Sequence, residues 1–132
     1  MRIEYFMVGD LVKDEEVVTK LDNLDFIDDR KEFSPIAITE EILLKSGFQK
    51  TREWMSEDKD YTYYHSNTTN DNFYNLYIKH LRNNVFFIRA ETFYYINAKG
   101  KEYSRIFTGD IWWVHEIQHI LRLLNIDKEI IL

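Results

Sequence analysis

Three stretches of the chain alternate between apolar and polar residues and are rich in aromatic and β-branched side chains. They span residues 61–66, 72–81 and 85–96. Alternation places every second side chain on the same side of an extended chain, and these residue types favour strands over helices. The pattern therefore predicts three strands of an antiparallel sheet, each with one apolar face.

The apolar faces also predict the turn between the second and third of these strands. In the second strand the face carries Tyr74, Leu76, Ile78 and His80. In the third it carries Phe86, Ile88, Ala90, Thr92, Tyr94 and Ile96. Residues 83–84 are both Asn, which tolerates a positive φ and marks a turn. A two-residue loop there would set Ile78 opposite Arg89 and mix the faces, so we predict a three-residue or bulged turn that sets Ile78 against Ile88 or Ala90.

Weaker alternation indicates further strands on either side. Residues 2–12 alternate loosely and contain the turn signal Gly9-Asp10, which predicts a short strand and turn, and this strand is a candidate to form a hairpin with residues 11–20. A strand is also predicted within 48–54. After the turn at 97–100, residues 101–107 are expected to return as another strand.

A short helix is predicted over residues 39–47. Thr39 has the residue type of an N-cap, and Glu40 and Glu41 favour the positive end of the helix. Gly47 is placed to end the helix in a left-handed conformation. The stripe expected to be buried comprises Ile42, Leu43 and Leu44.

A C-terminal amphipathic helix is predicted over residues 111–125, with Asp110 as its cap and Asn125 at its end. Its apolar residues recur at helical spacing and would make this helix the main cover of the sheet. They are Trp113, Val114, Ile117, Ile120, Leu121 and Leu124. Together the predicted strands and helices indicate an α+β fold in a single domain over 1–132. It consists of an antiparallel β-sheet of four or five strands packed by a short helix (about 39–47) and a C-terminal amphipathic helix (about 111–125).

Composition and charge limit the classes of function. The 132 residues contain no Cys, so disulfides, thiolate metal sites and a thiol nucleophile are excluded, and the chain fits a cytoplasmic location. No apolar stretch approaches the roughly 20 residues of a membrane span, and no signal peptide is indicated. The net charge is −6, and residues 1–60 hold 16 of the 23 acidic residues against 9 basic ones. This charge disfavours sequence-independent nucleic-acid binding and suits a basic partner.

The acidic residues are densest in the segment 22–32. A solvated surface loop is one interpretation of this segment. The other is a contact patch for a basic partner, in which apolar anchors are surrounded by charge. The candidate partner-binding residues are Asp22, Asp25, Phe26, Asp28, Asp29 and Glu32.

The C-terminal helix contains a literal H-E-x-x-H over residues 115–119. In a zinc hydrolase His115 and His119 would be ligands and Glu116 the general base. No third ligand is apparent, since only 13 residues follow His119, and Arg122, one turn further on, disfavours a dication. A solvent-facing stripe of an ordinary helix is the favoured interpretation, with no cofactor and no catalytic or metal-binding residue assigned.

Two blocks of the chain, together about a quarter of its length, resemble a known pattern. In residues 35–50 (PIAITEEILLKSGFQK) the matching positions are Thr39, Glu40, Leu43, Leu44, Gly47 and Phe48. In residues 113–130 (WVHEIQHILRLLNIDKEI) they are Val114, His115, Ile117, Gln118, Leu121, Leu124 and Glu129. The chain thereby resembles an uncharacterised family of small proteins of Bacteroidota phages, prophages and mobile elements. That family does not keep Glu116 and has Asn at His119, so the resemblance implies that His115 and Gln118 make structural hydrogen bonds and implies no activity.

The expected function is that of a small non-enzymatic phage or mobile-element accessory protein acting by protein–protein interaction in the host. An anti-CRISPR or other anti-defence inhibitor is the concrete version, with a basic nucleic-acid-processing enzyme or its RNA complex as the host partner. The zinc-dependent hydrolase is one alternative. Another is an RNA-binding sheet that stacks bases on exposed aromatics. Its candidate residues are Tyr61, Tyr63, Tyr77 and Tyr95, with Lys79, Arg82 and Arg89 nearby.

Overall fold

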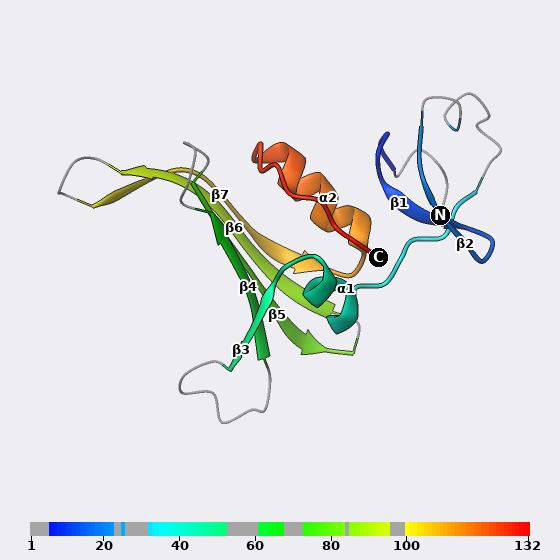
Figure 1. The fold of residues 1–132 in the computed structure, drawn as a ribbon, viewed down its shortest axis with the longest axis horizontal. Helices are drawn as coiled ribbons and strands as arrows, with labels where there is room; N and C mark the ends of the chain where they lie inside the picture. The colour runs from blue at the N-terminus through cyan, green and yellow to red at the C-terminus, as the bar shows by residue number, and fades with distance from the viewer. Residues whose placement is uncertain are drawn as a thin grey trace.

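The protein forms a five-stranded sheet covered on one face by two helices, with a separate two-stranded hairpin beside the helices (Figure 1). The structure is a computed structural model, and it describes residues 6–22, 25, 32–52, 61–67, 73–83, 85–95 and 100–132. The predicted α+β class with an antiparallel sheet and two helices is confirmed. Within the described residues, no helix has the length and apolar character needed to cross a membrane.

The five strands follow one another in space in the order in which they occur in the chain. They are β3 (Gln49–Arg52), β4 (Tyr61–Asn67), β5 (Tyr74–Arg82), β6 (Val85–Tyr95) and β7 (Lys101–Ile111). Every neighbouring pair is antiparallel. The sheet is therefore a simple meander, in which β3 and β7 are the two edges.

The pairing of β5 with β6 follows the apolar faces as predicted. Ile78 lies opposite Ile88, and the register shifts between His80 and Arg82, which marks a bulge next to the turn. The shift keeps the two apolar faces on one side of the sheet. Ile78 and Ile88 are both fully buried. The expected bulged turn is confirmed.

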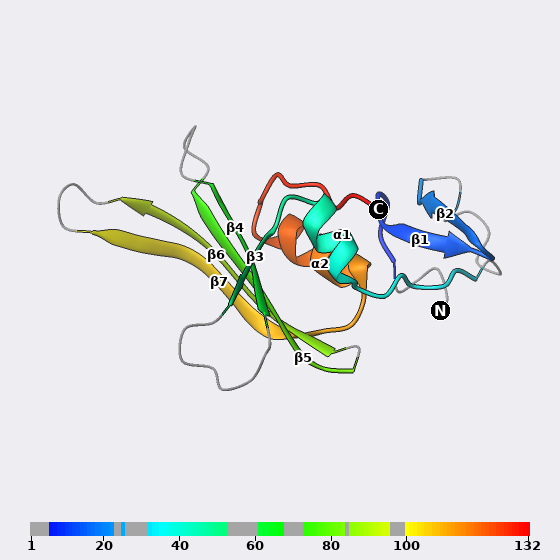
Figure 2. The same ribbon diagram turned by 60° about the horizontal axis from the view of Figure 1, so that its bottom comes forward.

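The main core lies between this face of the sheet and the helices α1 (Glu40–Lys45) and α2 (Val114–Leu123), which lie on the same side of it (Figure 2). The sheet and α2 contribute most of the buried side chains, and the chain after α2 adds Ile126 and Ile130. We call the opposite side of the sheet, away from the helices, the outer face.

The distal half of β6 departs from the predicted burial pattern. Tyr94, expected on the buried face, is 46% exposed, whereas Phe93 on the outer face is only 4% exposed. The hairpin formed by β6 and β7 extends past the helices, so no described helix covers its far end (Figure 1). Phe93 instead contacts the rings of Phe73 and Tyr103. Ile96 lies outside the described residues.

Helix α1 is capped as expected. The Thr39 side chain accepts a hydrogen bond from the Ile42 N–H, and Gly47 has a φ of +91° just past the helix end. Leu43 is fully buried. The prediction that Leu44 is buried was wrong, because a helix this short turns one apolar position toward solvent, where Leu44 is 46% exposed.

Helix α2 begins later than predicted. Its N-cap is Trp113, and Asp110 belongs to β7, so the assignment of Asp110 as the cap was wrong. The Glu116 side chain accepts hydrogen bonds from the N–H groups of Trp112 and Trp113, at 3.0 Å each. The glutamate at the third helical position thus accepts a hydrogen bond from the N–H of the N-cap residue, as in a capping box.

The residues before α1 form what we call the hairpin unit, residues 6–22 with 32–34. Its strands are β1 (Leu11–Asp14) and β2 (Val17–Lys20), joined by a tight turn in which Glu15 has a φ of +57°. Backbone hydrogen bonds tie Lys13 to Ser34. A small core of its own contains Phe6, Val12, Leu21 and Phe33. Among the described residues both paired strands lie within 11–20, so the predicted pairing of a strand in 2–12 with 11–20 was wrong. The Gly9-Asp10 turn signal falls where the chain enters β1.

Candidate functional site

The polar side of α2 faces the hairpin unit across a fully buried carboxylate, Asp10. Its Oδ2 lies 2.6 Å from Nε2 of His119 and accepts a 2.7 Å hydrogen bond from the Met7 N–H. Its Oδ1 accepts a 2.6 Å hydrogen bond from the guanidinium of Arg122. The predicted solvent-facing stripe over 115–122 is therefore only partly exposed. His115 is buried, whereas His119 and Arg122 are each about a third exposed beside the hairpin unit.

The charge of Asp10 is stabilised by these partners. Burial by itself raises the pKa of a carboxyl group, but here the hydrogen bonds from His119, Met7 and Arg122 outweigh burial and hold the pKa of Asp10 below its ordinary value. Asp10 is thus an anion in the folded protein near neutral pH. It acts as the anchor that joins the hairpin unit to α2.

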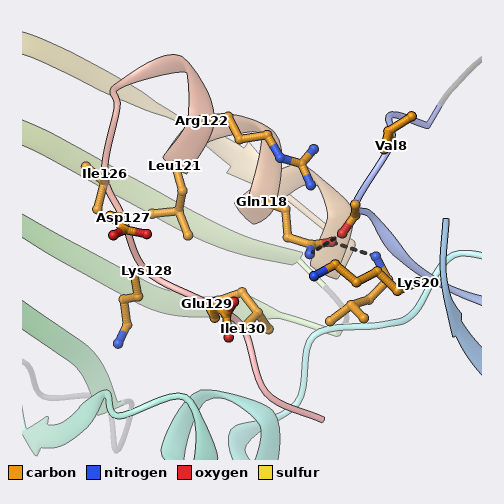
Figure 3. A pocket seen from close by; sticks show the side chains of 12 residues that line it. Val8, Lys20, Gln118, Leu121, Arg122, Ile126, Asp127, Lys128, Glu129 and Ile130 are labelled. Atoms are coloured by element: carbon orange, nitrogen blue, oxygen red, sulfur yellow. Dashed lines mark hydrogen bonds between the residues drawn. The ribbon is translucent and has the colours of Figure 1, made fainter. Parts of the chain in front are cut away.

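Gln118 makes a second polar link between the same two elements (Figure 3). Its Oε1 accepts a 2.9 Å hydrogen bond from the Leu11 N–H, and its Nε2 donates to the Gly9 carbonyl at 3.3 Å. The structural role expected for Gln118 is confirmed, but its partners lie in the hairpin unit and not in the five-stranded sheet. Beside it a cavity of about 440 Å³ is lined by both acidic and basic side chains, among them Lys20, Arg122, Asp127 and Glu129. This mixture selects no single charge class of ligand.

His115 lies in an apolar environment. It is 4% exposed, and its ring meets the ring of Phe6 edge-on at a centroid distance of 4.7 Å. Burial lowers the pKa of His115 to about 4. His115 is therefore neutral at physiological pH, and its buried Nδ1 has no hydrogen-bond partner among the described residues. The hydrogen bond expected for His115 is not seen at that atom.

The three fixed positions of the H-E-x-x-H thus have separate structural contacts. His115 packs on Phe6, Glu116 caps α2, and His119 pairs with Asp10. In the part of the chain that the structure describes, no group of three or more His, Asp or Glu side chains is placed to hold a metal ion. Oε1 of Glu116 accepts both of the backbone hydrogen bonds that cap α2.

The acidic segment is only partly described. Asp22 and Asp25 each accept a hydrogen bond from the other's backbone N–H, and Glu32 is exposed. Phe26, Asp28 and Asp29 lie outside the described residues. The contact patch over 22–32 stays a prediction.

The residues proposed for base stacking divide between the two faces of the sheet. Tyr63 is 6% exposed within the main core, so its assignment to a stacking surface was wrong. Tyr77, Lys79 and Arg89 lie together on the outer face, where they line one cavity. The side chains of Tyr61, Arg82 and Tyr95 lie outside the described part of the structure.

The remaining candidate surface is the edge of the sheet at β7. Among the described strands β7 pairs only with β6, and it runs for 11 residues, four residues past the predicted end at Phe107. A groove of about 270 Å³ separates it from α2. Its lining residues are Phe107, Asp110, Ile111, Glu116, His119, Ile120 and Leu123, and we call it the β7–α2 groove.

Two features were not predicted from the sequence, the buried contact of Asp10 with α2 and the full length of β7. Asp10 looked like a turn residue, and nothing local indicated a partner more than 100 positions away. The extension of β7 was missed because Gly109 and Asp110 are poor strand formers. The run of alternating residues that includes Ile106 and Asp110 was the available signal for it.

Comparison with known proteins gives no matching family, no matching curated protein and no matching solved structure.

Proposed function

We propose that the protein is a non-enzymatic accessory protein of a phage or mobile element that binds a host protein by adding a strand of that partner to β7. The observation that carries the proposal is the long edge strand beside the β7–α2 groove. An edge strand presents unpaired backbone groups, and extended peptides bind such edges while neighbouring pockets read their side chains.

The groove has the lining that such recognition needs. Phe107, Ile120 and Leu123 offer apolar surface, and Leu123 is 65% exposed. At the C-terminal end of α2, Arg105 donates a 3.1 Å hydrogen bond to the Leu123 carbonyl, which fixes the helix end against β7. An incoming segment would therefore meet a preformed surface, which lowers the entropic cost of binding.

The negative charge of the groove and of the whole chain favours a basic partner. Asp110 and Glu116 line the groove, and the whole chain carries a net charge of −6. We expect an extended segment with apolar residues at alternate positions and Lys or Arg near Asp110. A basic nucleic-acid-processing enzyme, such as an anti-CRISPR protein would inhibit, is the proposed partner class. Action in the host cytoplasm belongs to the same proposal and is supported by the absence of Cys.

The test is selection of binding peptides from a random library displayed on phage, with the whole protein as target. Selected peptides are expected to alternate apolar and basic residues and to slow amide hydrogen exchange along β7. Leu123→Lys removes apolar surface and adds a repelling charge, and should weaken binding by about tenfold or more. Leu44→Lys is the matched control, since Leu44 is exposed on α1 and does not line the groove.

Two outcomes would contradict strand addition at β7. One is a set of peptides that protects β3 or the hairpin unit instead. The other is equal binding by Leu123→Lys and the parent protein. Sedimentation of the free protein adds a further check, because pairing of β7 with a second copy of this chain would appear as a dimer that Leu123→Lys disrupts.

A further inference from the structure

The outer face of the sheet carries a second candidate site, independent of the β7–α2 groove. A cavity of about 480 Å³ lies on it, lined by side chains from β4, β5, β6 and β7. This volume falls in the range of small-ligand sites, roughly 300–1,000 Å³. No described helix covers this face (Figures 1 and 2). We call the cavity the outer-face pocket.

The strand register explains why these residues meet. Lys79 pairs with Thr62 on one side and with Phe87 on the other, which forms one row across the sheet. The adjacent row pairs Tyr77 with Arg89. Residues that pair directly across antiparallel strands point to the same face. Two aromatic rings and two cations therefore converge on one surface.

A buried carboxylate positions one of the cations. Glu91 is 3% exposed, and it accepts hydrogen bonds of 3.1 Å from Nε of Arg89 and from Nδ2 of Asn75. With Glu91 holding one edge of its guanidinium, Arg89 keeps its other donors available for a ligand. Lys79, Arg89 and Glu91 are the charged residues that line the pocket. Asp110 pairs with Phe87 but does not line the pocket.

An unpartnered hydroxyl is the second observation that points to a ligand. Thr62 is 9% exposed, lines the pocket, and its buried Oγ1 has no hydrogen-bond partner among the described residues. Buried polar atoms without partners are uncommon, because each costs free energy unless a ligand or water satisfies it. Because Oγ1 is itself buried, a rotation of the Thr62 side chain toward the pocket would be needed to bring this hydroxyl to a ligand atom.

The aromatic rings are suited to stacking. Tyr77 lies against Tyr64 at a centroid distance of 5.0 Å, which limits its rotation. Burial, with the neighbouring Tyr64 and Glu91, raises the pKa of Tyr77, so its phenol is neutral at physiological pH. A neutral ring beside cations is the combination that binds a base and its phosphate in single-stranded nucleic-acid sites.

We infer that the outer-face pocket binds one nucleotide unit, with its base against Tyr77 and Phe87 and its phosphate at Lys79 and Arg89. The unit comes either from a free mononucleotide or from single-stranded RNA, since both present the same base and phosphate. The net charge of −6 makes long nucleic-acid duplexes poor ligands.

The experiment is NMR titration of the whole protein with uridine 5′-monophosphate, with a short oligouridylate and with an RNA duplex. Shifts are expected at Thr62, Tyr77 and Arg89 with the first two ligands and not with the duplex. Affinity for the oligouridylate at least about tenfold above that for the mononucleotide assigns the natural ligand to single strands, and similar affinities assign it to free nucleotides.

Arg89→Met tests the cation, and because it also removes the ion-pair partner of the buried Glu91, the double variant Arg89→Met/Glu91→Gln is measured beside it. It is expected to weaken binding by about tenfold and to reduce the salt dependence. Tyr94→Ser is the matched control, an exposed aromatic of the same strand on the other face. Absence of any shift at millimolar ligand, or equal affinity of Arg89→Met and the parent, would overturn the inference. Because the pocket and the β7–α2 groove share no lining residue, Leu123→Lys should leave nucleotide binding unchanged.

Discussion

Helix α2 is held by the five-stranded sheet and by the hairpin unit in two physically different ways. Toward the sheet it buries Val114, Ile117, Ile120 and Leu121 in a continuous apolar core. Toward the hairpin unit it presents Gln118, His119 and Arg122, which hydrogen-bond to a turn and a buried carboxylate. The apolar core of the hairpin unit has four buried residues among those described, and Phe6 adds one ring contact to His115. Most of the contacts that attach the unit to α2 are therefore polar.

Because of this difference, the interface between α2 and the hairpin unit should respond to pH more than the interface between α2 and the sheet. Apolar burial varies little with pH, whereas a contact made by ionisable groups is lost when one of them changes charge. We therefore expect the sheet and α2 to unfold as one unit and the hairpin unit to detach under milder conditions. Three substitutions separate the two interfaces.

The largest effect is expected from Ile117→Ala, since Ile117 is fully buried in the main core. Loss of the side chain leaves a cavity and should lower the free energy of unfolding by about 4 kcal/mol. Chemical denaturation of the whole chain measures this. Leu123→Ala, an exposed position of the same helix, is the control and should change stability by less than about 0.5 kcal/mol.

The next effect is a pH dependence set by His115. Its pKa in the folded protein is about 4, below its ordinary value of 6.5, so the unfolded chain binds more protons between these values. The contribution of His115 to the free energy of unfolding should then have its full value above about pH 6.5. The free energy of unfolding should fall by roughly 3 kcal/mol as the pH drops to 4. His115→Phe removes this slope while keeping a ring against Phe6, and His80→Gln should retain it. An unchanged slope in His115→Phe would assign the pH dependence to other groups.

The smallest of the three effects is expected from Asp10→Ala. Arg122 and His119 are each about a third exposed and can turn to water, so the loss should be about 2 kcal/mol and local. Amide hydrogen exchange should speed up in β1 and β2 and stay slow in β5. Asp14→Ala, an exposed carboxylate at the end of β1, is the control.

The same carboxylate adds an acid-induced step. Because the pKa of Asp10 is lowered, its contribution is present above its ordinary pKa near 3.8 and is lost as the pH falls below that value. Detachment of the hairpin unit at a higher pH than unfolding of the sheet would agree with this order. Simultaneous loss of both would show that the hairpin unit is part of the same cooperative unit.

The elements that sequence predicted well are those governed by neighbouring residues. Alternation over 72–81 and 85–96 predicted two strands and their register, and Thr39 and Gly47 predicted the ends of α1. Capping and strand alternation act over a few residues, so their signals are local. The start of α2 was missed because Asp110 is a good capping residue, while the backbone there continues β7.

The candidate sites were predicted less well because they depend on contacts between distant segments. The H-E-x-x-H suggested zinc chemistry, yet the partner of His119 is Asp10, and no local pattern links the two. Tyr77 and Arg89 were predicted as one surface because strand pairing follows from alternation. Tyr63 was assigned to the same surface wrongly, since its burial depends on which face the helices cover.

The meander of β3 to β7 has a consequence for how the chain reaches its structure. Each strand pairs with the strand that comes next in the chain, so the sheet closes only short loops as it forms. The contact between Asp10 and His119 instead joins residues 109 positions apart. We therefore expect the sheet and α2 to assemble first and the hairpin unit to dock last, even though it is synthesised before them.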